Sequence, residues 1–241
     1  MRFNLLSKGL LALIFVSVFS IFTSCDGDEP AEPAVKDIPR DGLVAFYPFN
    51  GNANDESGVG DSANAIFSGT PNPAVLTTDR FGNPNSAYQI EQDNSIEVLD
   101  SEKIRVLGDF AFSAWVKLST SGYIIDTSRH YLEFDQSTNE IIVRISEDAT
   151  NSIYLKKVIA NPGEWHFICA TWDETNQIGK LYIDGQLEAQ ENPSLNVINT
   201  TGDAMYFGDY NFSGIIDDIA IYNEALTSPE VESLFQQNIT K

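Results

Sequence analysis

The stretch "FAFSAWVKLSTSGYIIDTSRHYLEFDQSTNEIIVRIS", residues 110–146, holds four short apolar runs separated by turn residues. In the run "HYLEF" (130–134) apolar and polar side chains alternate, which places them on opposite faces of a strand. Runs of this kind begin with "DGLVAFYPF" (41–49) and continue to "IIDDIAIY" (215–222). The pattern predicts an all-β fold of antiparallel strands, a sandwich or a barrel.

Two local signals refine this prediction. In "YIDGQL" (182–187), Asp184 and Gly185 stand between two short runs, which is a strong signal for a tight hairpin. A helical period first occurs in "TSPEVESLFQQ" (227–237). There Thr227 and Glu230 can form a capping box, or Ser228 can cap a helix that begins at Pro229. We expect one short C-terminal helix.

The charge balance excludes one class of partner. The chain of 241 residues has 35 acidic and 14 basic side chains, and its basic residues form no cluster. Because phosphate binding needs grouped Lys and Arg, we expect no nucleic-acid partner. Hydrophobic residues make up 42% of the chain, enough for the core of a single domain.

The N-terminus is typical of an exported protein. Arg2 and Lys8 accompany the apolar run of residues 9–22, which is too short to span a bilayer and suits a signal peptide. The run ends in "FTSC", which resembles a bacterial lipobox. This resemblance implies a signal peptide over residues 1–24 and a lipid on the thiol of Cys25. The alternative is an ordinary signal peptide followed by an incidental cysteine.

The segment after Cys25 is rich in proline and acid. Residues 25–39 contain little that can be buried, so we expect an extended tether. Acids directly after the cysteine resemble the export signal of bacterial surface lipoproteins. The sequence therefore predicts an outer membrane lipoprotein, exposed at the cell surface, whose folded domain comprises residues 40–241.

Five blocks of the sequence carry a family resemblance. The outer two are "GLVAFYPFNGNANDESG" (42–58) and "FSGIIDDIAIYNEALTSPEV" (212–231), and between them stand "FAFSAWVK", "WHFICATWD" and "LYIDGQLEA". In this order they resemble the laminin G-like, concanavalin A-like lectin and glucanase domains. The resemblance implies a jelly-roll sandwich of two antiparallel sheets. That fold hosts lectins, glycosidases and adhesive domains alike, so it leaves the function open.

The last block contains two adjacent carboxylates in an apolar strand. Strict alternation places Asp217 on the same face as Ile219 and Ile221, and Asp218 on the opposite, solvated face. A charge on an apolar face is costly unless it is paired, hydrogen-bonded or bound to a metal. Asp217 is therefore expected to meet a specific partner.

The loop "NGNANDESG" (50–58) offers such a partner, because a jelly roll that pairs its first and last strands lets the loop reach Asp217. The loop is dense in oxygen ligands, and the resemblance adds that many family members carry a calcium ion near these blocks. The hypothesis is a structural Ca²⁺ held by Asp55 and Asp217, with Asn54 or Asp218 contributing. The alternative is that Asp217 accepts backbone hydrogen bonds from the loop without a metal.

The catalytic motif of glycosidases on this fold is incomplete. Such enzymes carry several acids on one strand, spaced as E-x-D-x-E or E-x-D-x-x-E, so that a nucleophile and an acid flank the substrate. Here "LEFDQSTN" supplies Glu133 and Asp135, but Ser137 and Thr138 stand where the next acid is needed. A glycoside hydrolase is thus a lesser alternative, and we expect no enzymatic activity.

The remaining function is binding. Sugar recognition needs exposed aromatic rings with polar groups beside them. Tyr123, Arg129, His130 and Tyr131 lie on or beside one expected hairpin, and Tyr210 lies in the turn before the last strand. The sequence predicts a membrane-tethered module that binds a glycan; a domain for protein-directed adhesion or assembly is the alternative. A row of aromatic residues would favour the glycan, and a flat apolar patch would favour an extracellular protein.

Overall fold

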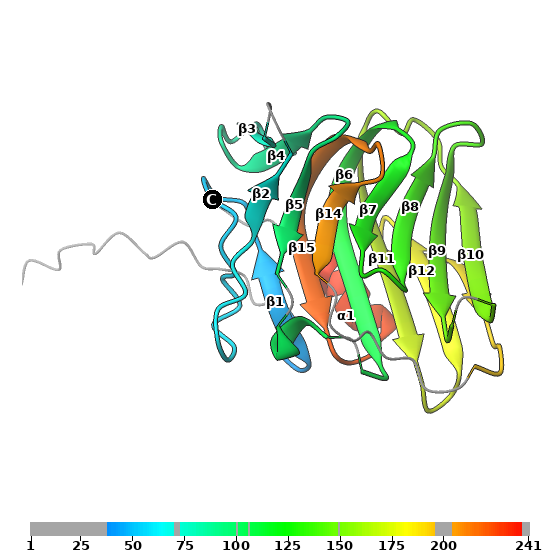
Figure 1. The fold of residues 1–241 in the computed structure, drawn as a ribbon. Helices are drawn as coiled ribbons and strands as arrows, with labels where there is room; N and C mark the ends of the chain where they lie inside the picture. Colours follow the sequence, from blue (N-terminus) through cyan, green and yellow to red (C-terminus); the bar gives the residue numbers. More distant parts are fainter. Residues whose placement is uncertain are drawn as a thin grey trace, which may run out of the picture. The chain divides into compact units, whose positions relative to one another are not determined.

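A computed structural model of the protein describes residues 38–69, 73–99, 101–105, 107–148, 150–195 and 204–237. These residues belong to one compact unit, which extends over residues 33–241. Two antiparallel sheets face each other, so the predicted jelly-roll sandwich is confirmed (Figure 1). The expected signal peptide, Cys25 and nearly all of the tether lie outside the described residues. No helix in the described part of the chain is both long and apolar enough to cross a membrane.

One sheet has eight strands. In the order in which they lie side by side, seven of them are β13 (Gln186–Glu191), β12 (Ile178–Ile183), β11 (Trp165–Asp173), β6 (Phe110–Thr120), β15 (Ser213–Tyr222), β4 (Ala87–Ile90) and β3 (Val75–Thr77). The eighth, β1 (Leu43–Tyr47), pairs antiparallel with β15, so the first and last strands of the domain lie together as expected.

The other sheet has seven strands. In spatial order they are β10 (Ser152–Val158), β9 (Glu140–Ser146), β8 (Tyr131–Asp135), β7 (Gly122–Asp126), β14 (Met205–Asp209), β5 (Ser95–Val98) and β2 (Ile66–Ser68). A single turn of 3-10 helix, η1 (Glu102–Ile104), follows β5 in the chain.

The main core lies between the two sheets. It is built from inward-facing side chains of both, among them Phe112 and Trp172 from one sheet and Phe134 and Phe207 from the other. All four are at most 1% exposed. Full burial of an apolar side chain of this size stabilises the folded state by roughly 1.5–3 kcal/mol, so this layer supplies most of the driving force for folding.

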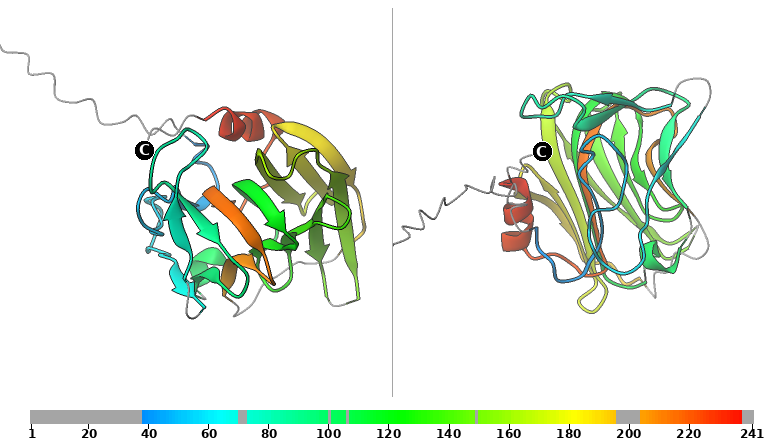
Figure 2. Two further views of the ribbon diagram at one scale, coloured as in Figure 1. Left: turned by 90° about the horizontal axis from the view of Figure 1, so that it is seen from above. Right: turned by 90° about the vertical axis from the view of Figure 1, so that its left-hand side faces the viewer.

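A second apolar cluster covers the outer face of the eight-stranded sheet. The helix α1 (Ser228–Phe235) lies over this face, where Val231 and Leu234 pack with Phe46 and Tyr222 (Figure 2). The helix begins as predicted, because the backbone N–H of Thr227 donates to the Glu230 carboxylate at 2.7 Å and closes the capping box. The predicted C-terminal helix is confirmed.

The predicted hairpin is confirmed between β12 and β13. Asp184 and Gly185 have φ angles of 49° and 78°, both in the left-handed region that the turn of a two-residue hairpin requires. Glycine adopts this conformation at no steric cost, which explains why the pair marks the turn in the sequence.

Strict alternation fails in β15. Ile216, Ile219 and Ile221 all belong to the core between the sheets, because the register with β6 shifts between Asp217 and Ala220. Asp218 takes a φ of 46° at this β-bulge. One extra residue re-phases the strand, so Asp217 lies on the outer face, away from Ile219 and Ile221. The prediction that these residues share a face is wrong for this reason.

Candidate ligand-binding site

The outward side chains of the seven-stranded sheet fall into a line across the strands. Asp126 on β7 is paired in register with Tyr206 on one side and with Tyr131 on the other. The pairing continues outward in both directions, so that the full row from β5 to β10 is Glu97, Tyr206, Asp126, Tyr131, Arg144 and Tyr154. Neighbouring strands lie about 4.8 Å apart, so the row extends for roughly 20 Å or more.

Tyr131 of this row forms a stack with two further tyrosines, and we call the three the tyrosine cluster: Tyr210, Tyr123 and Tyr131. The rings of Tyr123 and Tyr131 have centroids 4.5 Å apart and are inclined by only 19°. Tyr210 leans on Tyr123 with a centroid distance of 4.9 Å, and it is 68% exposed. The inner two rings therefore hold Tyr210 in place at the open end of the stack.

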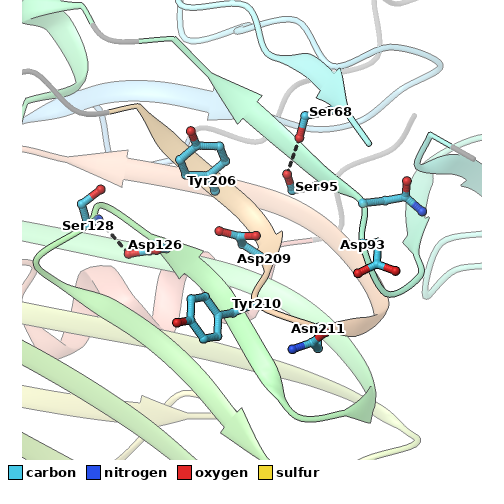
Figure 3. A pocket seen from close by; sticks show the side chains of 10 residues that line it. Ser68, Asp93, Ser95, Asp126, Ser128, Tyr206, Asp209, Tyr210 and Asn211 are labelled. Carbon is cyan, nitrogen blue, oxygen red and sulfur yellow. Dashed lines mark hydrogen bonds between the residues drawn. The ribbon is translucent and has the colours of Figure 1, made fainter. Parts of the chain in front are cut away.

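Tyr210 stands at the edge of a pocket of about 590 Å³ (Figure 3). The walls come from β2, β5, β7, β14 and three loops, and the lining residues are Ser68, Asp93, Asn94, Ser95, Asp126, Ser128, Tyr206, Asp209, Tyr210 and Asn211. A volume of this size is typical of pockets that bind small molecules. The lining combines an exposed ring with hydroxyls, amides and carboxylates.

The polar lining is partly ordered by hydrogen bonds. Asp126 Oδ1 accepts from the backbone N–H of Ser128 at 2.7 Å, and the hydroxyls of Ser68 and Ser95 lie 2.5 Å apart. Burial, and then the nearby charges of Glu133 and Asp126, raise the pKa of Tyr123 above its ordinary value. The hydroxyl of Tyr123 therefore stays protonated at neutral pH and is available as a donor.

Two groups of residues that the sequence analysis treated separately come together here. Tyr123 and Tyr131 were selected from one hairpin and Tyr210 from a distant turn, and the pairing of β14 with β7 unites them. Tyr206 and Asp209 were not selected. Alternation along β14 puts Tyr206 on the face opposite Phe207, but it puts Asp209 on the same face as Phe207; Gly208, with a φ of 69°, interrupts the alternation between them. The sequence also does not reveal which strand lies beside β14.

His130 is placed wrongly by the sequence analysis. The side chain is 1% exposed, stacks on Phe110 with centroids 5.0 Å apart, and accepts the backbone N–H of Ser146 through Nδ1 at 3.2 Å. Burial, and then the charges of Arg129 and Arg144, lower its pKa to about 3. It is a neutral core residue. Arg129, half-buried in the loop before it, does not line the pocket.

Glu133 and Asp135 lie on the outward face of β8, as their spacing predicted. Burial, and then the charge of Asp135, raise the pKa of Glu133. Asp135 Oδ1 accepts from the backbone N–H of Ser137 at 2.8 Å, so it caps the following turn. Neither residue lines the pocket, and the two make no catalytic pair there.

On the opposite side of the sandwich, Asp217 meets a partner that the sequence analysis did not identify. Arg80, from the loop between β3 and β4, lies with Nη1 3.3 Å from Asp217 Oδ2 and also contacts Asp218. Its guanidinium lies 4.4 Å from the ring centroid of Trp115, and Nη2 donates to the carbonyl of Gln237 at 3.1 Å. We call Arg80, Asp217 and Asp218 the buried ion cluster.

The position of this cluster follows from the pairing of β15. One edge of β15 pairs with β4 at residues 214–216 and with β1 at residues 219–222. The two aspartates lie at the bulge, between the segment of β15 that pairs with β4 and the segment that pairs with β1. Arg80 contacts them at this point. Asp218 is 5% exposed, so the expectation that it is solvated is wrong.

Asp55 belongs to a different ion pair. Its Oδ1 accepts the backbone N–H groups of Phe46 at 3.1 Å and Ser57 at 3.0 Å, and its Oδ2 contacts the ammonium of Lys103. Burial raises its pKa, but hydrogen bonds from Lys103, Ser57 and Phe46 outweigh this and keep the pKa below its ordinary value. The carboxylate thus fixes the loop after β1 in its ionised form.

The predicted calcium ligands do not fit one shared ion. Asp55 is paired with Lys103, whereas Asp217 and Asp218 are paired with Arg80, and Asn54 is exposed on its loop. Among the described residues, no group of three or more His, Cys, Asp or Glu side chains could hold a metal ion. In this structure each of the three aspartates named as calcium ligands is instead paired with a basic side chain of the protein.

The solved structures with a similar fold include binding domains of toxins. The binding domain of Paraclostridial Mosquitocidal Protein 1 matches with a TM-score of 0.64 and 19% identity, over 81% of this chain and 52% of that chain. The botulinum neurotoxin serotype C1 binding domain matches with a TM-score of 0.64 and 16% identity, over 82% and 52%.

A third structure is the botulinum neurotoxin serotype D ligand binding domain in complex with N-acetylneuraminic acid, with a TM-score of 0.64, 18% identity and coverage of 82% and 51%. This chain spans about half the length of these domains, so the likeness concerns the fold.

A comparison with curated proteins gave no significant match. The sequence profile of the concanavalin A-like lectin/glucanases superfamily matches residues 91–232, which is more than half of the chain. This stretch contains most strands of both sheets. It also contains every residue that lines the pocket except Ser68. The chain therefore belongs to the concanavalin A-like lectin/glucanases superfamily, in its laminin G-like branch.

Proposed function

We propose that the protein is a binding module that takes a glycan on the outer face of the seven-stranded sheet. The observation that carries this proposal is Tyr210, a 68% exposed ring held by the tyrosine cluster at the edge of a pocket rich in hydroxyls, amides and carboxylates. An exposed ring offers an apolar surface to a sugar ring, while the polar groups bond its hydroxyls.

The distribution of apolar surface favours a glycan over a protein partner. The large apolar side chains that are exposed are distributed over both sheets, for example Val75 on β3, Val158 on β10 and Leu187 on β13. A protein-binding surface is more often a contiguous apolar patch. The solved structures with this fold that are named as binding domains agree with a role in binding.

The row across the sheet indicates the size of the ligand. Tyr206, Tyr131, Arg144 and Tyr154 continue from the pocket over four strands of the sheet. A surface of this length exceeds one sugar ring, so the ligand is an oligosaccharide that crosses the strands. Hydrolysis is not part of this proposal, because Glu133 and Asp135 lie outside the pocket.

Glycan binding is tested on an oligosaccharide array, followed by calorimetry with the strongest ligand. Tyr210→Ala should weaken binding at least tenfold, which corresponds to about 1.4 kcal/mol, because the sugar loses its apolar contact. Leu187→Ala, on the edge strand β13 of the other sheet, is the matched control and should bind normally. An array without any bound glycan, or a Tyr210→Ala protein of unchanged affinity, contradicts the proposal.

We further propose that the module is anchored to the outer membrane by a lipid on Cys25 and exposed at the cell surface. The lipobox-like "FTSC" and the acidic tether of residues 25–39 support this proposal. Cys25→Ser should move the protein out of the membrane fraction or leave its precursor uncleaved. A processed Cys25→Ser protein that remains in the membrane fraction contradicts the lipid anchor.

A further inference from the structure

The pocket on the outer face of the seven-stranded sheet has an acidic lining. Asp93, Asp126 and Asp209 line the pocket, and no Lys or Arg is among the lining residues. Arg144 and Lys156, on β9 and β10, lie at the other end of the face. The charge of the pocket lining is therefore negative, whereas the far end of the face combines these two basic side chains with Glu133 and Glu140.

The acidic lining of the pocket suits a ligand with hydrogen-bond donors rather than a ligand with negative charges. An ionised carboxylate only accepts hydrogen bonds, so Asp93 and Asp209 can receive the hydroxyls of a sugar. A sugar carboxylate or sulfate has no proton to donate at neutral pH. It would also bring a like charge close to both aspartates, and this repulsion is strong in a partly desolvated pocket.

Tyr206, on the pocket wall, reports the same negative surroundings. Its hydroxyl donates to Glu97 Oε1 at 3.4 Å. Burial, and after it the charges of Glu97, Asp209 and Asp126, raise its pKa above the ordinary tyrosine value. The lining aspartates do not form a metal site, since the described part of the chain contains no group of acidic or other ligands that could hold an ion.

We infer that the pocket takes a neutral sugar residue and discriminates against sugars that carry a carboxylate or a sulfate. The inference rests on the glycan-binding function proposed above and specifies its ligand class. It sets this site apart from the neurotoxin serotype D domain, whose structure holds N-acetylneuraminic acid. The selectivity comes from Asp93 and Asp209 in particular, because both lie on the pocket wall in loops or at a strand end.

The test compares each neutral oligosaccharide of an array with its sialylated, uronic and sulfated counterparts, using the purified protein. Calorimetry then measures the strongest neutral ligand and its acidic counterpart. The acidic form should bind at least tenfold more weakly. Raising the salt concentration from about 0.01 M to 1 M should narrow this gap, because the Debye length falls from about 30 Å to 3 Å.

Two variants separate the local charge from the net charge. Asp209→Asn keeps the size of the side chain. It should reduce the ratio between the affinities for the neutral and the acidic ligand several-fold. Glu191→Gln, exposed on β13 of the other sheet, removes the same charge far from the pocket and should leave the gap unchanged. If Asp209→Asn does not fold, the salt series on the unaltered protein decides.

The outcomes distinguish this inference from the proposed function. Absence of any glycan binding overturns the proposed function itself. Binding of acidic and neutral glycans with equal affinity, or preference for the acidic ones, overturns the inference and leaves the glycan-binding function intact. The inference is also overturned if neither salt nor Asp209→Asn changes the difference in affinity between neutral and acidic glycans. That difference would then have a cause other than charge.

Discussion

On the outer face of the eight-stranded sheet, Asp217 and Asp218 close on Arg80 beneath the end of α1, whereas on the other outer face Asp93 and Asp209 line an open pocket. In the buried ion cluster the guanidinium compensates the carboxylates, and rings of Trp115 and Phe81 cover it. In the pocket the walls hold no Lys or Arg. The adjacent acids Asp217 and Asp218 therefore have a structural role. Acidic side chains that could contact a ligand are recognised by their position on an accessible pocket wall, as for Asp93 and Asp209.

The largest expected effect comes from removing the cation of the buried ion cluster. Arg80→Met leaves Asp217 and Asp218 buried without the guanidinium, so the free energy of unfolding should fall by about 3–5 kcal/mol. At roughly 2–4 °C per kcal/mol, the melting temperature should fall by about 6 °C or more.

Arg144→Met, on the face that carries the pocket, is the matched control for this experiment. It should cost no more than about 1 kcal/mol, because the half-buried Arg144 contacts only the hydroxyl of Ser152 and the ring of Tyr131 among the interactions described, and leaves no buried carboxylate behind. Equal losses in the two variants, measured by thermal unfolding, would remove the distinction between the two faces.

A smaller loss is expected at the ion pair of Asp55. Lys103→Met removes one charged hydrogen bond, but the backbone N–H groups of Phe46, Ser57 and Ala63 still bond the carboxylate. The cost at neutral pH should be about 1.5–3 kcal/mol. Chemical unfolding of the variant and the unaltered protein measures it.

The same pair predicts a dependence of stability on pH. The pKa of Asp55 in the folded protein lies below the ordinary value of 3.8. Its ionised form therefore stabilises the fold above that value, and this contribution is lost as the pH falls through the folded pKa. The difference between the unaltered protein and Lys103→Met should shrink as the pH is lowered from neutral into this acidic range. A difference that stays constant contradicts the role given to this ion pair.

The smallest effect on stability is expected at Glu133, beside the tyrosine cluster. The pH dependence of its contribution to stability is opposite to that of Asp55. The folded pKa of Glu133 is raised above 4.5, so its charged form is disfavoured in the folded protein. Stability is then fullest below that value and declines as the pH rises through the folded pKa. Glu133→Gln should leave the free energy of unfolding at neutral pH within about 0.5 kcal/mol, or raise it slightly. A clear loss of stability would show that the carboxylate is structurally required.

Local signals predicted most of the fold. Asp184-Gly185, the capping box of Thr227 and Glu230, and the alternation in β8 each depend on a few neighbouring residues, and each was confirmed. The family resemblance supplied what local signals lack, namely that the first and last strands pair. β2 and β3 were not predicted, because each has only three residues and no clear alternation.

The candidate site was predictable only in part. The pairing of Asp217 with Arg80 joins residues 137 positions apart, and the bulge that turns Asp217 outward has no recognisable signal in "IIDDIAIY". The burial of His130 depends on Phe110 in a strand of the other sheet. Register across several strands, which assembles the pocket from Tyr206 and Asp126, is a property of the whole sheet.

The chain enters the domain on the side of α1. Ile38, 1% exposed, belongs to the apolar cluster that α1 covers on the outer face of the eight-stranded sheet. The pocket opens on the outer face of the opposite sheet. If the segment before Ile38 attaches the domain to a surface, as proposed above, the attachment is on the side of the eight-stranded sheet. For the proposed lipid-anchored binding module, the pocket then lies on the sheet opposite to the one at which the chain enters.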